Sequence, residues 1–174
     1  MNKQTITFEQ FKKLITDNGK KANACIEQYK RILSSSNFEE LLQVIKDNYD
    51  WCFNNSIFTK DDIKAIGEEV LLPNGFYYDY NGIIDSVKCA FVYDGVIQEV
   101  RGNATIQDVR GNATIQDVRG NATVQNVGDN ATVQNVGDNA TVQNVGDNGI
   151  YKDYRYNKPK LVMKKDAFEI VYID

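Results

Sequence analysis

Residues 103–149 read NATIQDVRG NATIQDVRG NATVQNVGD NATVQNVGD NATVQNVGD NG, which is five near-identical nonapeptides followed by the start of a sixth. A degenerate unit precedes them, because Gly95–Val100 aligns with Ala104–Val109. Repeats of a short fixed period are the signature of solenoids, in which each coil buries its apolar residues against its neighbours. The sequence therefore predicts a β-solenoid over residues 101–149.

Each unit contains one short strand. Ala104 and Ile106 alternate with Thr105 and Gln107, so the apolar pair is expected to point into the core and the polar pair outward. β-branched residues dominate the units, which favours strand over helix. At the next position Asp108 breaks the alternation, which allows the following valine to point inward across a corner. The Gly and Asn residues between units supply the turn.

The length of the unit leaves two coil geometries open. Nine residues are few for a whole coil around a filled core, so a flattened coil of two units, with one strand on each face, is favoured over a coil of one unit. Stacked coils would lie about 4.8 Å apart, and like residues would then form ladders in which Asn amides bond to one another. The expected ladders are Asn103, Asn121 and Asn139 on one side, and Asn112, Asn130 and Asn148 on the other.

The rest of the chain suggests an α+β protein, with a helical domain over 1–72, a strand-rich entry and cap over 73–100, the solenoid over 101–149 and a C-terminal cap over 150–174. The stretch from Lys20 to Leu33 carries Ala22, Ile26, Tyr29 and Leu33 at intervals of four, three and four, which is typical of one helix face. The apolar stripes of the helices are most simply a small core. A groove that binds a partner is the alternative.

Open solenoid ends aggregate unless they are covered, and tyrosines lie on both sides of the repeats. Capping is one interpretation of them, and interface hot spots, in which Tyr is enriched, are the other. These tyrosines are Tyr77, Tyr78, Tyr80, Tyr151, Tyr154 and Tyr156.

The N-A-T-[IV]-Q-x-V units resemble those of uncharacterised bacterial and phage-borne proteins that carry DNATV-type nonapeptide arrays behind a short helical segment. The resemblance covers residues 95–149 and, loosely, the helical part. It implies a β-solenoid and suggests a mobile genetic element, for which an inhibitor of a bacterial defence system is a reasonable function.

Composition disfavours an enzyme. The chain has no histidine, which removes Cys-His and Ser-His catalytic arrangements and most zinc sites. No catalytic, cofactor-binding or metal-binding residue is predicted, and no cofactor. Residues 91–150 hold three basic and seven acidic residues, whereas nucleic-acid binding usually needs a basic stripe. This charge pattern disfavours direct nucleic-acid binding. Three widely spaced cysteines, no signal peptide and no membrane-spanning run indicate a cytoplasmic protein.

The leading functional hypothesis is a non-catalytic protein-binding module, for example an inhibitor that occludes its target. One alternative is a structural protein that self-associates through its solenoid ends. The other is a calcium-binding repeat protein similar to RTX rolls, although each unit offers at most one Gly-Asp pair. Besides the tyrosines, the predicted interaction surface comprises Thr105, Gln107, Thr114, Gln116, Thr123 and Gln125.

Overall fold

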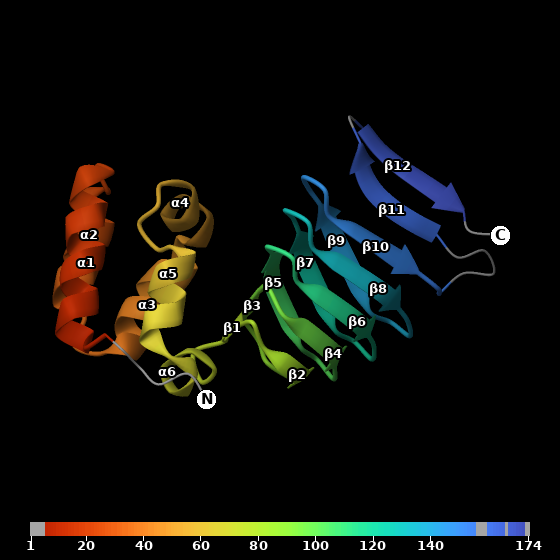
Figure 1. The fold of residues 1–174 in the computed structure, drawn as a ribbon, viewed down its shortest axis with the longest axis horizontal. Coiled ribbons are helices and arrows are strands. Elements are labelled where there is room, and N and C mark those ends of the chain that lie inside the picture. The colour runs from red at the N-terminus through yellow and green to blue at the C-terminus, as the bar shows by residue number, and fades with distance from the viewer. Residues whose placement is uncertain (1–5, 156–159, 166, 173–174) are drawn as a thin grey trace. The chain divides into compact units, whose positions relative to one another are not determined.

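The chain divides into two compact units, Met1–Asn74 and Gly75–Asp174, here called the helical unit and the solenoid unit (Figure 1). The computed structural model describes residues 6–155, 160–165 and 167–172. The predicted α+β architecture, with helices followed by a β-solenoid, is confirmed.

The helical unit is built from short helices, and a side chain caps the N-terminus of α1, α3 and α5. Thr7 and Thr59 each form a capping box, and the Asn37 side chain accepts a hydrogen bond from the Glu40 amide. The helices are α1 (Phe8–Lys21), α2 (Ile26–Ser34), α3 (Phe38–Asp47), α4 (Tyr49–Asn54), α5 (Lys60–Ile66) and α6 (Glu68–Leu71). Buried helical side chains, including Phe11, Ile15, Leu41 and Leu42, form a core together with Phe58, which lies between α4 and α5.

Helix α2 departs from its predicted role. The stripe through Ile26, Tyr29 and Leu33 was expected to be core, but Ile26 is 76% exposed and Leu33 is 49% exposed. Ile32 is the buried residue of this helix. The prediction of a buried stripe on α2 is therefore wrong, because the helix packs through a different side.

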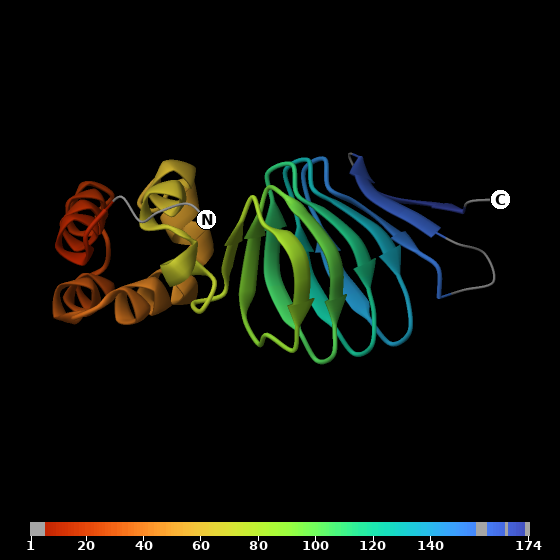
Figure 2. The same cartoon turned by 60° about the horizontal axis from the view of Figure 1, so that its bottom comes forward.

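The solenoid unit consists of two sheets, and the strands from β1 to β10 alternate between them along the chain (Figures 1 and 2). The five-stranded sheet contains β1 (Phe76–Tyr78), β3 (Ala90–Tyr93), β5 (Thr105–Arg110), β7 (Thr123–Val127) and β9 (Thr141–Val145). The seven-stranded sheet contains β2 (Asn81–Asp85), β4 (Val96–Arg101), β6 (Thr114–Val118), β8 (Thr132–Val136), β10 (Ile150–Asp153), β11 (Lys160–Lys165) and β12 (Ala167–Tyr172).

Two nonapeptides make one coil, as favoured from the sequence. Thr105 pairs with Thr123 and Thr114 pairs with Thr132 in parallel register, so each residue lies beside its equivalent two units later. The backbone ladder continues through the corners, where the Asn130 amide donates to the Gly111 carbonyl and the Asn148 amide donates to the Asp129 carbonyl. Neighbouring coils are thus joined all the way round and not only along the strands.

The core between the sheets uses three residues of each unit. Ala104, Ile106 and Val109 have no exposed surface, and the same holds for their equivalents in the second unit. The turn into the next strand depends on the last position of each unit, where Gly111 has a φ of 69° and Asp129 a φ of 50°. This left-handed backbone favours Gly and also tolerates Asp.

Both predicted asparagine ladders are present. Asn121 Nδ2 donates to Asn103 Oδ1 at 3.2 Å, and Asn139 Nδ2 donates to Asn121 Oδ1 at 3.3 Å. On the other side, Asn130 and Asn148 continue the ladder that starts at Asn112. Each interior member of a ladder is a donor to one coil and an acceptor from the next.

The coil geometry makes deletions of different length behave differently. Removing 112–129 takes out one coil and leaves Gly111 followed by an Asn, so we expect a cooperatively unfolding protein. Removing 112–120 takes out half a coil, so every strand beyond the cut moves to the other sheet and β10 to β12 extend the wrong one. This deletion should lower the melting temperature much more than the deletion of 112–129. Circular dichroism melts compare the two, and equal melting temperatures would contradict the two-unit coil.

The ladder can be tested by one truncation. Asn121→Ala removes two side-chain hydrogen bonds, each worth about 0.5–1.5 kcal/mol, so we expect the free energy of unfolding to fall by about 1–3 kcal/mol. Gln116→Ala is the matched control, since Gln116 is exposed on a strand outside the ladders. It should change stability by less than about 0.5 kcal/mol. Urea titrations measure both, and an Asn121 effect no larger than the control would show that the ladder adds no stability.

Candidate interaction surfaces

The predicted surface of Thr and Gln residues is divided between two faces. Thr105, Gln107, Thr123 and Gln125 belong to the five-stranded sheet, whereas Thr114 and Gln116 belong to the seven-stranded sheet. Of these six side chains, Gln116 is exposed and the other five are half-buried. The repeats therefore present two separate polar faces, because successive units alternate between the sheets.

The tyrosines at the entry to the solenoid pack against one another. Tyr78 stacks on Tyr93 with 6.2 Å between ring centroids, and Tyr77 meets Tyr80 edge-on at 5.1 Å. Tyr77 is 8% exposed, and its burial, with a smaller contribution from Tyr80, raises the pKa of its hydroxyl. Of these three predicted surface residues, Tyr77 is therefore buried, whereas Tyr78 and Tyr80 are half-buried.

The tyrosines that follow the repeats differ in exposure. Tyr151 is half-buried in β10, whereas Tyr154 is 48% exposed; Tyr156 lies outside the described residues. Tyr154 lies beside a hollow of about 270 Å³ in the solenoid unit. Arg119 borders the hollow and forms a 3.2 Å ion pair with Asp117. The other lining residues are Asn135, Val136, Gly137 and Asp138.

A buried ion pair closes the solenoid core at its C-terminal end. Asp153 occupies the inward column of the seven-stranded sheet, beside Val136, and is 3% exposed. Arg155 donates to both of its carboxylate oxygens and also to the Ala140 carbonyl. Burial alone would raise the pKa of Asp153, but the hydrogen bonds and charge of Arg155 outweigh it and hold that pKa below its usual value.

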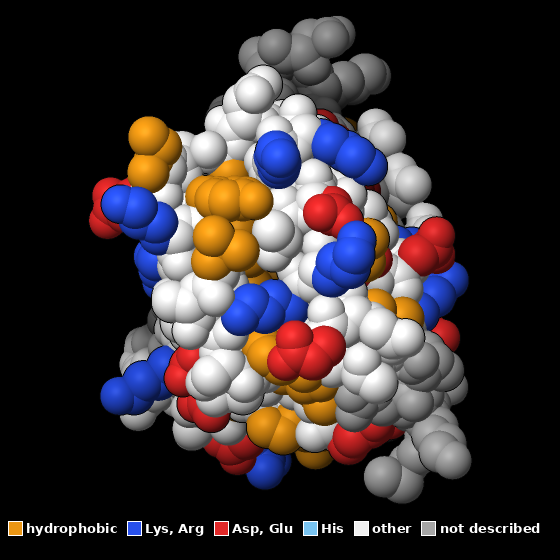
Figure 3. Space-filling model, turned by 90° about the vertical axis from the view of Figure 1, so that its left-hand side faces the viewer, with side chains coloured by type: hydrophobic (Ala, Val, Ile, Leu, Met, Phe, Trp, Pro, Cys, Tyr) orange, Lys and Arg blue, Asp and Glu red, His pale blue; other side chains and the backbone are white. Residues whose placement is uncertain are grey.

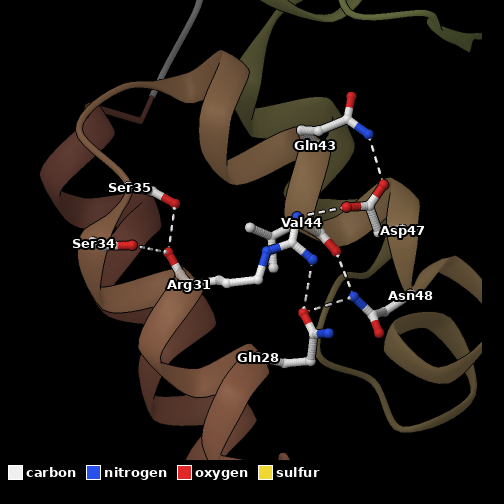
Figure 4. A network of polar contacts seen from close by, with 8 residues as sticks. All are labelled: Gln28, Arg31, Ser34, Ser35, Gln43, Val44, Asp47 and Asn48. Carbon is white, nitrogen blue, oxygen red and sulfur yellow. Dashed lines mark hydrogen bonds and ion pairs between the residues drawn. The ribbon is translucent and has the colours of Figure 1, made fainter.

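A polar network joins α2 to α3 in the helical unit (Figure 4). Arg31 donates to Asp47 and to Gln28, and Gln43 donates to the other oxygen of Asp47 at 2.7 Å. Burial tends to raise the pKa of Asp47, and the bonds from Arg31 and Gln43 lower it below its usual value. A hollow of about 520 Å³ adjoins this network. Its lining residues are Arg31, Ser34, Ser35, Asn37, Glu39, Glu40, Gln43 and Val44.

This hollow gives little reason to expect catalysis or anion binding. The Arg31 guanidinium is already engaged by a carboxylate and an amide. Two glutamates stand at the start of α3, where an anion would otherwise be favoured, and Glu40 already accepts from the Ser36 amide and hydroxyl. The network therefore positions α2 against α3.

The apolar stripe of α2 points outward, whereas the sequence predicted that it would face the core. Figure 3 shows hydrophobic side chains gathered in a strip on one face of the helical unit, bordered by Lys, Arg, Asp and Glu side chains. On α2 the exposed apolar residues are Ile26 and Leu33, with half-buried Tyr29 between them. Periodicity identified these residues but could not show which side of the helix packs inward.

The described residues include a buried thiol and lack a cluster that could hold a metal ion. Burial raises the pKa of the Cys52 thiol to about 11, which disfavours its nucleophilic thiolate. Within the described part of the chain, no three His, Cys, Asp or Glu residues are grouped so that they could hold a metal ion. None of the described helices has the length and apolar character that crossing a bilayer requires.

Comparison with protein-family models, with curated proteins and with solved structures gave no match. Any functional inference therefore rests on the residues and geometry of this chain.

The cap at Asp153 predicts a pH effect. Because its folded pKa is lowered, Asp153 stabilises the fold above its unfolded pKa of about 3.9, and that contribution is lost as the pH falls through the folded value. Asp153→Asn should destabilise the protein by about 3 kcal/mol at pH 7, since Arg155 loses its counter-charge. The difference between the two proteins should shrink below about pH 4. Urea titrations at several pH values measure it, and a difference independent of pH would contradict this role.

Proposed function

We propose that this chain is a non-catalytic protein-binding module that docks through the exposed apolar stripe of α2. The observation that carries the proposal is the outward orientation of Ile26, Tyr29 and Leu33 on a helix whose opposite side is packed. Large apolar side chains that are exposed together and bordered by charge often mark protein interaction sites. The partner would be a protein with an apolar groove.

The spacing of the stripe supports this mode of binding. Positions 26, 29 and 33 recur at i, i+3 and i+7, which is the anchor pattern of an amphipathic helix that lies in a hydrophobic groove. Lys30 is exposed on the same helix, four residues after Ile26 and three before Leu33, and would form part of a polar rim. Arg31, held by Asp47 at the α2–α3 junction, keeps the helix in place before binding, which lowers the ordering cost of association.

The solenoid unit gives such a module bulk and stiffness. Its coils are joined by backbone hydrogen bonds through strands and corners, so it would act as a rigid body covalently linked to the docked helical unit. A rigid body attached to a docked helix can exclude other macromolecules from the target. Together with the resemblance to phage-borne repeat proteins, this favours an inhibitor of a bacterial defence system that acts by occlusion.

A capture experiment with matched variants tests the proposal. The test variant carries Ile26→Ser and Leu33→Ser, and the control carries Glu27→Ser on the same helix. Burial of two such side chains contributes about 3 kcal/mol or more, so we expect affinity for the partner to fall by roughly 100-fold or more in the test variant alone. Quantitative mass spectrometry of captured proteins identifies the partner by its loss from that variant, and titration then gives Kd.

Folding is expected to be unaffected because both substituted side chains are exposed, with stability changes within about 0.5 kcal/mol. A partner that binds the double variant as tightly as the original protein would exclude α2 as the docking surface.

A further inference from the structure

The two sheets of the solenoid end at different levels. In the described part of the chain, the five-stranded sheet ends at β9, whereas its neighbour in the same coil, β10, is followed by the antiparallel strands β11 and β12 (Figures 1 and 2). Since strands lie about 4.8 Å apart, the C-terminal end has a step about 10 Å high.

Both edges of this step are open among the described residues. Strand β9 pairs with β7 on one side, and β12 pairs with β11 on one side. β11 approaches β9 but pairs with β10 and β12. Thr141 and Gln143 are exposed, whereas their equivalents in the preceding coil, Thr123 and Gln125, are half-buried. Open strand edges are templates for pairing with another chain.

We infer that a second copy of this chain covers both edges, in a closed dimer with twofold symmetry. A twofold axis parallel to the strands inverts the solenoid axis and exchanges the planes of the two sheets. The two extra strands of one copy then occupy the two levels that the five-stranded sheet of the other copy lacks. Strand β12 of each copy adds to β9 of the other, so one operation covers all four edges.

The strand directions agree with this arrangement. Strands of one coil run in opposite directions on the two faces, so β10 runs opposite to β9. Two antiparallel pairings return β12 to the direction of β10. A twofold axis parallel to the strands preserves direction, so β12 of one copy lies antiparallel to β9 of the other, which is a regular sheet pairing.

The register also continues the core into the step. Ile97, Ile115 and Val133 form a fully buried column, which Tyr151 and Val162 extend along the seven-stranded sheet. Val162 is 7% exposed and pairs with Ile170. In the dimer the hairpins of the two copies face each other across the core, so this column gains an apolar surface opposite it.

Charge distinguishes the two sides of the interface. Residues 121–149 contain Asp129, Asp138 and Asp147 and no Lys or Arg, whereas residues 150–174 contain six Lys or Arg residues against four acidic ones. The dimer brings the basic terminal segment of one copy to the acidic last coils of the other. In the alternative arrangement, the five-stranded sheet of one copy would continue directly into the five-stranded sheet of the other. That arrangement would bring the acidic last coils of the two copies together.

Light scattering across a wide concentration range tests the inference. We expect a mass that reaches twice that of one chain and stays there. Val142→Lys should shift the midpoint of dimerisation at least tenfold to higher concentration, because this half-buried side chain would be enclosed by the partner's β12. Gln116→Lys adds the same charge at an exposed position of β6, away from the step, so it is the control and should leave the dimer unchanged.

A second measurement covers the case in which Val142→Lys fails to fold. In the unmodified protein, the amides of β9 that face away from β7 should exchange with deuterium more slowly as concentration rises, while those of β7 should not change. A monomer at every concentration, a mass that rises without limit, or equal behaviour of two folded variants would overturn the inference.

Discussion

The structure depends on one constraint, which is that each residue of the solenoid must lie beside its equivalent eighteen residues later. Only then do the amides of one coil meet the carbonyls of the coil before it, including at the corners, where the Asn130 amide bonds to Gly111 and the Asn139 amide to Gly120. The same register places Val109 beside Val127 in the core, and it aligns the side-chain amides of the asparagines. Since interiors are close-packed, a change in the length of one unit would disturb the whole stack beyond it.

Within that constraint the repeats vary in a coordinated way. Units that end in Arg-Gly carry an acid two residues before the arginine, and the pairs Asp108–Arg110 and Asp117–Arg119 neutralise each other. Units that end in Gly-Asp carry Asn in place of that acid, and their terminal Asp has a different role. Asp129 Oδ2 accepts from the Gly111 amide and Asp138 Oδ2 from the Gly120 amide, one coil away. Early units thus balance charge within a coil, whereas later units use the carboxylate to join coils and leave a net negative charge.

The solenoid could be predicted from sequence because identical residues recur at a fixed interval. Stacking equivalent residues on one another is the arrangement in which every unit can make the same contacts. The period of two units, the inward positions and the asparagine ladders all follow from that argument. The helical unit could not be derived as fully. Ile26, Tyr29 and Leu33 were identified by their spacing, but spacing carries no information about which side of α2 meets α1 and α3. That choice is made by Ile32 and by the contacts of Arg31 with Asp47, which join residues far apart in the chain. The Asp153–Arg155 cap was missed for the same reason, since nothing in the local sequence indicates that Asp153 points into the core.

The ends of the solenoid follow from the same physics as its middle. A coil in the interior has a neighbour on each side. The neighbouring coils hydrogen-bond its backbone groups and bury its apolar side chains. The last coil lacks one neighbour, and the chain departs from the repeat where that occurs. In the seven-stranded sheet the valine column gives way to Asp153, whose charge is compensated by Arg155, and Arg155 also binds the Ala140 carbonyl at the end of the other sheet. Among the described residues, the terminal hairpin pairs with the edge of β10, and no strand pairs with the outer edge of β9. Because a regular stack gains stability from each added coil and has no intrinsic length, its size is set by such departures at the ends.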